Sequence, residues 1–207
     1  AFAIAIGLFI VLPAFLVKGS NEDATMFSSL KEGLIKISFF VAYIYIISLM
    51  NDIKRVFQYH GAEHKSIFAY EKGLELTVDN VKKMPRLHPR CGTSFLFIVM
   101  MISILVYSIA DSFIPQPETL LMKQLLKVGV RFGFMPLIAG IAYELQRYSS
   151  RNLGNPIIKL LAAPGLALQK ITTGEPDESQ LEVSMTALRA SLNMEVNNAI
   201  NIEEEQK

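Results

Sequence analysis

The residues best suited to chemistry in this sequence are its three histidines and its single cysteine, which all lie between residues 51 and 93. His60 and His64 belong to a His-x-x-Glu-His pattern, and His88 begins a His-x-x-Cys pair that ends at Cys91. Histidines four residues apart on a helix can direct one ring nitrogen each to the same ion, and zinc takes such nitrogen and sulfur ligands. We therefore predict a divalent metal site, with zinc as the ion, at His60, His64, His88 and Cys91.

The number of ligands decides what such a site does. If all four side chains bind, the site is closed and structural, because a catalytic zinc keeps one position for water. If Cys91 stays off the ion, or Glu144 replaces it, the site is open. Glu63 then acts as the general base of a hydrolase, as in His-x-x-Glu-His metalloproteases. In the alternative without a metal, the histidines are a surface pair, Glu63 pairs with Lys65 or Arg90, and Cys91 is a small buried apolar residue.

The composition of the chain favours a membrane protein. Of its 207 residues, 51% are hydrophobic and 19% are charged, and the mean hydropathy is +0.35, which is too apolar for an ordinary soluble domain. A net charge of +1, with no basic block interleaved with aromatic residues, excludes a nucleic-acid partner. One cysteine forms no intrachain disulfide, which fits a reducing compartment. The chain opens inside an apolar run without methionine, so we expect a piece of a longer protein rather than a signal peptide.

Stretches of mainly apolar residues predict four transmembrane helices in an all-α, polytopic membrane bundle with additional interfacial and cytoplasmic helices. These stretches are 1–17, 34–50, 95–110 and 128–145. Lysine and arginine concentrate between the second and third stretches and after the fourth, so both regions are predicted to be cytoplasmic in a bacterial plasma membrane. The expected organisation is 1–50 (helices 1 and 2), 51–93 (the His-rich loop domain), 94–146 (helices 3 and 4), 147–177 (an interfacial or re-entrant segment) and 178–207 (an amphipathic helix and tail).

Local signals place the candidate residues on shorter elements. Asn51 or Asp52 is expected to cap a helix that runs to about Gly73, either along the membrane surface or as an extension of the second crossing. Thr77 is expected to cap a second, short helix. The apolar stretch 156–171 is expected to be broken at Pro164-Gly165. After it, apolar residues follow helical spacing and need a cover, which the His-rich loop, the membrane surface or a second subunit can supply. They are Leu181, Met185, Leu188, Leu192, Val196 and Ile200.

The fourth transmembrane stretch leaves a second function class open. Its cations share one helical face, and the simplest explanation is that their side chains extend to the lipid headgroups. The simplest explanation of Glu144 is an ion pair with Arg147. Alternatively, this helix lines a pore or a helix interface in a channel, transporter or assembly scaffold without enzymatic activity. The residues concerned are Lys123, Lys127, Arg131, Gly129, Gly133, Ala139 and Gly140. Expected partners are the lipid bilayer, a second copy of the chain, and a cytoplasmic or membrane protein that docks on the C-terminal stripe.

Three long motifs carry a resemblance to a known family. They run from Arg55 to Lys65, from Arg86 to Ser94 and from Ala163 to Pro176. Together they resemble the YqhQ-like family of bacterial membrane proteins, a domain of unknown function that is labelled a predicted metal-dependent enzyme. The resemblance implies a bacterial plasma-membrane protein whose motif positions are His60, Glu63, His64, His88 and Cys91. Members also carry an upstream stretch with a Gly-Gly-Gln-Ala motif, which is absent from this sequence.

Overall fold

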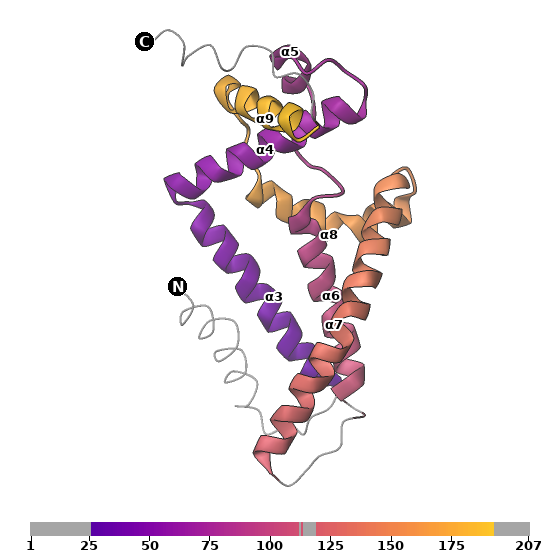
Figure 1. Cartoon of the computed structure of the whole chain (residues 1–207). Helices are drawn as coiled ribbons and strands as arrows, with labels where there is room; N and C mark the ends of the chain where they lie inside the picture. Colours follow the sequence, from indigo (N-terminus) through magenta and orange to yellow (C-terminus); the bar gives the residue numbers. More distant parts are fainter. Residues whose placement is uncertain (1–25, 112, 114–118, 193–207) are drawn as a thin grey trace.

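A computed structural model describes residues 26–111, 113 and 119–192, and within these ranges every regular element is a helix. The helices keep chain order as α3 (Met26–Ser48), α4 (Asn51–Glu71), α5 (Val78–Lys82), α6 (Gly92–Asp111), α7 (Leu120–Arg151), α8 (Pro156–Thr172) and α9 (Glu178–Ser191). The long helices α3, α6 and α7 form one end of the molecule, α4, α5 and α9 form the other, and α8 crosses between them (Figure 1). The all-α prediction is therefore confirmed for the described residues.

Two helices are long and apolar enough to cross a membrane, at Gly92–Ala110 in α6 and Leu125–Arg151 in α7. A third crossing results only if α3 and α4, which meet at an angle of 101°, are counted as one bent span. Lys31, Glu32 and Lys36 place three charges in the first half of α3, which weakens it as an independent span. The described residues thus hold two or three candidate crossings, compatible with a membrane protein. The predicted helix at 1–17 lies outside them.

The two ends of α4 follow the sequence prediction in part. The helix stops at Glu71, and Gly73 adopts a φ of 67°, a left-handed conformation that is typical of glycine after a helix. The predicted capping by Asn51 or Asp52 is wrong, because the capping position is Met50, without a side-chain hydrogen bond. Asp52 lies in the first helical turn instead, where its negative charge interacts favourably with the positive end of the helix dipole. Thr77 does cap α5 as predicted, since its hydroxyl accepts from the Asn80 N–H at 3.4 Å.

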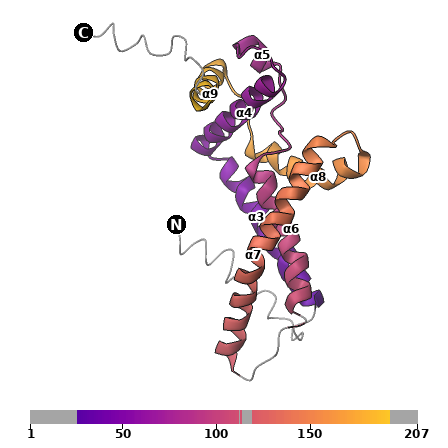
Figure 2. The ribbon, with the colours of Figure 1, turned by 45° about the vertical axis from the view of Figure 1, so that its right-hand side comes forward.

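The apolar stripe of α9 is covered by the His-rich region, the first of the three covers expected from the sequence. Helices α4 and α9 lie side by side in both views of the ribbon (Figures 1 and 2). Leu181 and Met185 are 1% and 6% exposed in a core shared with Ala62, Ala69 and Val81. The predicted positions Val196 and Ile200 lie outside the described residues. This small core fixes α4, which carries two of the histidines, against the rest of the chain.

Helix α8 corrects the expectation that Pro164-Gly165 breaks the chain. It is one helix of 17 residues, with Asn155 as its cap and Pro164 in its interior. The reason is a tertiary contact, because Gly165 is buried against Ser94 of α6. A Cβ atom at position 165 would lie only 3.0 Å from the Ser94 side chain. Packing against α6 thus compensates for the hydrogen bond that proline removes. Its C-terminal end delivers residues 169–175 to the histidines of α4.

Candidate metal centre

Three candidate ligands meet where α4, the segment before α6 and the end of α8 come together. His60 and His64 lie one turn apart on α4, and their ring centroids are 4.4 Å apart. The Nε2 atom of His60 lies 3.2 Å from Sγ of Cys91. One ligand atom from each of the three residues lies within 4.8 Å of the others. Zinc bonds of about 2.0–2.3 Å in a tetrahedron separate ligand atoms by roughly 3.3–3.7 Å, so the spacing suits one ion.

Backbone carbonyl groups orient both imidazole rings. Nδ1 of His60 lies 2.8 Å from the Thr172 carbonyl oxygen, and Nδ1 of His64 lies 2.5 Å from the Arg86 carbonyl oxygen. A carbonyl oxygen only accepts hydrogen bonds, so each Nδ1 carries the proton and donates it. The hydrogen bond with Cys91 raises the pKa of His60. In the neutral form of either ring, which is the form that binds a metal ion, the lone pair is on Nε2. Metal-binding histidines in proteins are commonly held in this way, by an N–H donated to a carbonyl or carboxylate on the side away from the ion.

Cys91 is buried, with 6% of its surface exposed, and its surroundings favour the thiolate. Burial alone raises the pKa of this thiol, but hydrogen bonds with His60, His64 and Thr93 outweigh burial and lower the pKa to about 5. The thiolate is the form of cysteine that binds metal ions. Two imidazole nitrogens and one thiolate are a donor set that suits zinc.

His88 is close to this group but does not belong to it. Its ring centroid is 5.7 Å from that of His64. Nδ1 accepts from the Arg90 N–H at 3.2 Å, which leaves the proton on Nε2, 3.4 Å from a carboxylate oxygen of Glu71. Burial lowers the pKa of His88, which favours the neutral ring. Both of its nitrogens are therefore engaged elsewhere, and the structure does not place His88 in one group with His60, His64 and Cys91, as the His-x-x-Cys spacing had predicted.

The structure also places Glu144 away from the three candidate ligands. Its carboxylate is exposed on α7 and pairs with Arg147 at 3.2 Å, as in the simpler of the two sequence interpretations. Gln146, two residues further along and therefore on the opposite face of the helix, points inward. It donates to the carbonyl oxygen of Cys91 at 2.9 Å. The buried face of α7 thus supports the backbone of the cysteine and supplies no carboxylate to the site.

Glu63 lines the same cavity of about 240 Å³ as His60, His64 and Cys91. It is exposed, and the pairings expected for it in the absence of a metal are not observed. Among the described residues, Lys65 pairs with Glu175, and Arg90 with Glu71 at 2.6 Å. Glu63 therefore lines the cavity as an exposed residue, and no ion pair holds its carboxylate within the part of the chain that the structure describes.

Several residues that build this site were not singled out from the sequence. Glu71, which binds both His88 and Arg90, lies seven residues after His64, a spacing that places it on the same face of α4 two turns on. That spacing is a signal the sequence does contain. Gln169 is fully buried and holds the backbone of His88, with bonds of 2.8 Å to its N–H and 2.7 Å to its carbonyl. No periodicity marks Gln169, which is one of four polar residues in the mainly apolar helix α8.

Two glycines allow the end of α8 to approach α4. A Cβ atom at Gly61 would lie 2.1 Å from the carbonyl oxygen of Gly174. The N–H of Gly174 donates to the Phe57 carbonyl at 2.7 Å. This close approach carries the neighbouring Thr172 carbonyl to His60. The glycine within the His-x-x-Glu-His pattern is thus explained by backbone contact.

Comparison with known proteins agrees with the family resemblance. The model of a family described as "Protein of unknown function (DUF1385)" matches residues 1–194. The chain is 36% identical over 190 residues to the "Uncharacterized protein YqhQ" of Bacillus subtilis (strain 168), which covers 91% of this chain. The chain spans 57% of the length of that relative. No solved structure matches the chain significantly.

Proposed function

The chain belongs to the DUF1385 family of proteins of unknown function, and from the geometry of its site we propose that it is a bacterial plasma-membrane protein that binds zinc. The ligands are His60, His64 and Cys91, at the membrane interface. One observation carries the proposal: three donor atoms lie within 4.8 Å of one another, and both histidines donate their Nδ1 protons to backbone carbonyls. This arrangement presents two lone pairs and a sulfur to the same small volume.

The site is of the open kind, which favours a metal-dependent hydrolase. Three protein ligands leave one position of a tetrahedral ion for water or substrate, as in catalytic zinc sites. A bound divalent ion supplies a Lewis acid that polarises a carbonyl or phosphoryl oxygen. Glu63, at the mouth of the same cavity, is suited to accept a proton from a water molecule there. The substrate class that fits this location is a peptide or a lipid-linked molecule at the membrane surface.

The placement at the cytoplasmic face rests on charge and surface character. Lysines and arginines concentrate in residues 51–93 and after residue 146, which includes the α4, α5 and α9 end of the molecule. By the positive-inside rule that end faces the cytoplasm. Large apolar side chains at the other end, among them Leu105 of α6 and Phe132 of α7, are 54% and 68% exposed, as suits contact with lipid. A second copy of the chain, or a membrane protein partner, would cover part of the same surface.

Metal analysis tests the binding proposal. Protein purified in detergent without added metal is expected to hold about one zinc ion per chain, measured by plasma mass spectrometry. His60→Ala, His64→Ala and Cys91→Ser are each expected to reduce it well below stoichiometry, whereas Glu144→Gln, on an exposed residue, serves as the control and keeps it. No stoichiometric ion in the parent, or equal metal content in all variants, contradicts the proposal.

The enzymatic part has a separate test. Glu63→Gln keeps the shape of the side chain and is expected to leave the zinc content unchanged while abolishing the cellular function of the protein. Full function in Glu63→Gln with normal zinc content would remove the hydrolase and leave the metal site.

A second candidate is a non-enzymatic channel, transporter or assembly scaffold with a structural metal site. One observation favours it: the three ligands and their carbonyl partners join three separate segments, namely α4, residues 86–91 and the end of α8. A metal there would fasten these segments together. Under this candidate, chelation lowers the thermal stability of the chain, and Glu63→Gln retains full cellular function.

A further inference from the structure

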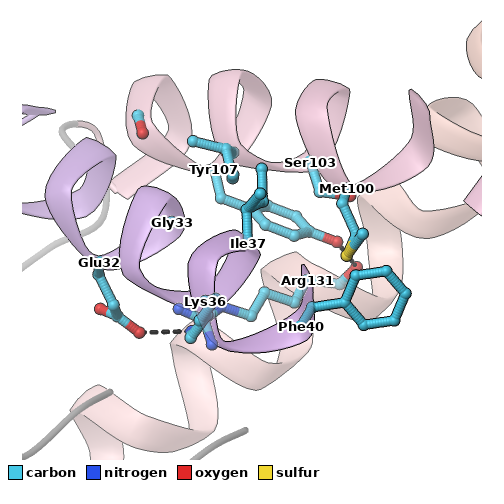
Figure 3. Close-up of a pocket in the computed structure, with 11 residues that line it drawn as sticks. Glu32, Gly33, Lys36, Ile37, Phe40, Met100, Ser103, Tyr107 and Arg131 are labelled. Carbon is cyan, nitrogen blue, oxygen red and sulfur yellow. Dashed lines mark hydrogen bonds and ion pairs between the residues drawn. The ribbon is translucent and has the colours of Figure 1, made fainter. Parts of the chain in front are cut away.

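A second cavity, of about 300 Å³, is lined by residues of α3, α6 and α7. These long helices form the end of the molecule opposite to α4, α5 and α9 (Figure 1). Side chains of Lys36, Tyr107 and Arg131, from three different helices, gather around one space (Figure 3). Its lining combines charged, polar and apolar residues. They are Glu32, Lys36 and Arg131, Ser103, Tyr107 and Ser108, and Gly33, Ile37, Phe40, Met100 and Ile104.

The charges in this cavity do not cancel. Glu32 pairs with Lys36 at 2.5 Å, one helical turn away. Arg131 forms no ion pair within the described part of the chain. Its guanidinium lies 5.7 Å from the ring centroid of Tyr107, and its Nε atom is buried without a hydrogen-bond partner. One carboxylate therefore faces two cations, and Lys127 adds a third cation near enough to act electrostatically on Glu32.

An uncompensated guanidinium is costly at this place. Arg131 lies within the candidate membrane span Leu125–Arg151, where a charged side chain is unfavourable unless it is paired or reaches the headgroups. A buried N–H without an acceptor is unfavourable as well. A phosphate oxygen would remove both costs, because guanidinium and phosphate form paired, charge-assisted hydrogen bonds.

The order of residues along the helices favours an amphiphile over a free anion. On α3 the charged Glu32 and Lys36 come first, and the apolar Ile37 and Phe40 lie further from the start of the helix. On α6, which runs the opposite way, Tyr107 lies close to the end of the span at Ala110, and Met100 lies deeper. The polar part of the cavity is therefore near the membrane boundary, and the apolar part extends toward the bilayer centre.

We propose that this cavity binds one anionic phospholipid, with its phosphate between Lys36 and Arg131 and the start of its acyl chains against Phe40 and Met100. This site is independent of the metal centre. The cavity volume of about 300 Å³ suits the phosphate and glycerol of one lipid, and the acyl chains continue along exposed apolar surface of α3, α6 and α7. Gly33 permits the close crossing of α3 and α6 at this point, since a Cβ atom there would lie 2.5 Å from Ile104.

Native mass spectrometry of the full chain in detergent, titrated with phosphatidylglycerol or phosphatidylcholine, tests the proposal. The parent protein is expected to retain one phosphatidylglycerol at concentrations at least about tenfold lower than those needed for phosphatidylcholine. Arg131→Gln and Lys36→Gln should each remove most of this preference. Arg151→Gln, which removes an exposed cation at the far end of the same helix, is the matched control and should keep it.

Glu32→Gln separates a binding role from a structural one. It breaks the pair with Lys36 and leaves the cavity more positive, so it should tighten phosphatidylglycerol binding, whereas a purely structural role predicts weaker binding. Unchanged helical circular dichroism and an unchanged melting temperature show that each variant is folded. The proposal is overturned if the parent binds both lipids equally, if Arg151→Gln matches Arg131→Gln, or if millimolar inorganic phosphate displaces the lipid as effectively as phosphatidylglycerol does.

Discussion

Gly61→Ala should damage the metal site without touching a ligand. The new Cβ atom would lie 2.1 Å from the Gly174 carbonyl oxygen, and real Cβ atoms essentially never come closer than 3.0 Å to a neighbour. The backbone at Gly174 must therefore retreat by about 0.9 Å. It cannot yield as a flexible side chain would, because the clashing atom is main chain.

This movement strains two hydrogen bonds. The Gly174 N–H donates to the Phe57 carbonyl at 2.7 Å, and the Thr172 carbonyl accepts from His60 at 2.8 Å. A retreat of this size would lengthen both beyond useful hydrogen-bond distance. At about 0.5–1.5 kcal/mol each, the loss is about 1–3 kcal/mol, which is also the usual cost of overpacking a core. Without the Thr172 carbonyl, His60 loses its orientation, and zinc affinity should fall about 10- to 100-fold.

The assay is a zinc competition titration against a chelator of known affinity, with thermal unfolding in detergent beside it. The stability loss should lower the melting temperature by roughly 3–10 °C. Gly133→Ala is the matched control, because a Cβ atom there meets nothing within 4 Å and should leave both values nearly unchanged. Parental zinc affinity and stability in Gly61→Ala would refute the reasoning that this backbone contact positions His60.

Two further predictions concern the helix that covers α4. Leu181 is only 1% exposed, so Leu181→Ala should destabilise the chain by about 2–5 kcal/mol and increase hydrogen exchange in α9. Val183→Ala, at a 54% exposed position, is the control and should have little effect. Similar losses of stability in both variants would contradict the described core. Asp177 caps α9, and a hydrogen bond from the Gln180 backbone N–H lowers its pKa. The contribution of this carboxylate to folding stability is therefore fully present above the unfolded pKa of about 3.9 and is lost as pH falls through the lower folded pKa. Asp177→Asn should therefore reduce the fall of the melting temperature at acid pH. An unchanged fall would contradict the capping role of Asp177.

Much of the fold around the site was predictable because it depends on local spacing. Apolar residues at intervals of three and four predicted α4 and α9, and Gly73 and Thr77 marked real helix boundaries. The four-residue spacing of His60 and His64 places both rings on one face, whatever packs against it. The confirmed features are those that one helical turn determines.

Which candidate residues lie together was harder to predict, because it depends on contacts between distant segments. His88 has the spacing of a ligand to the same ion as Cys91, yet Glu71 and the Arg90 backbone hold its ring elsewhere. Glu144 is an acid near the end of a membrane helix, but it lies on the face opposite to Gln146, which supports the site. In both cases the rotation of the helix or segment about its own axis decides which side chains face the site. The residue types alone do not specify that rotation.

The most direct test of the shared ion is X-ray absorption at the zinc edge on the purified protein. The site at His60, His64 and Cys91 predicts nitrogen ligands at about 2.0–2.1 Å and one sulfur at about 2.3 Å. Cys91→Ser, reloaded with zinc, should lose the sulfur shell and keep the imidazole shell, and Glu144→Gln should leave the spectrum unchanged. A spectrum without sulfur in the parent protein, unaltered by Cys91→Ser, would contradict a zinc site at these three residues.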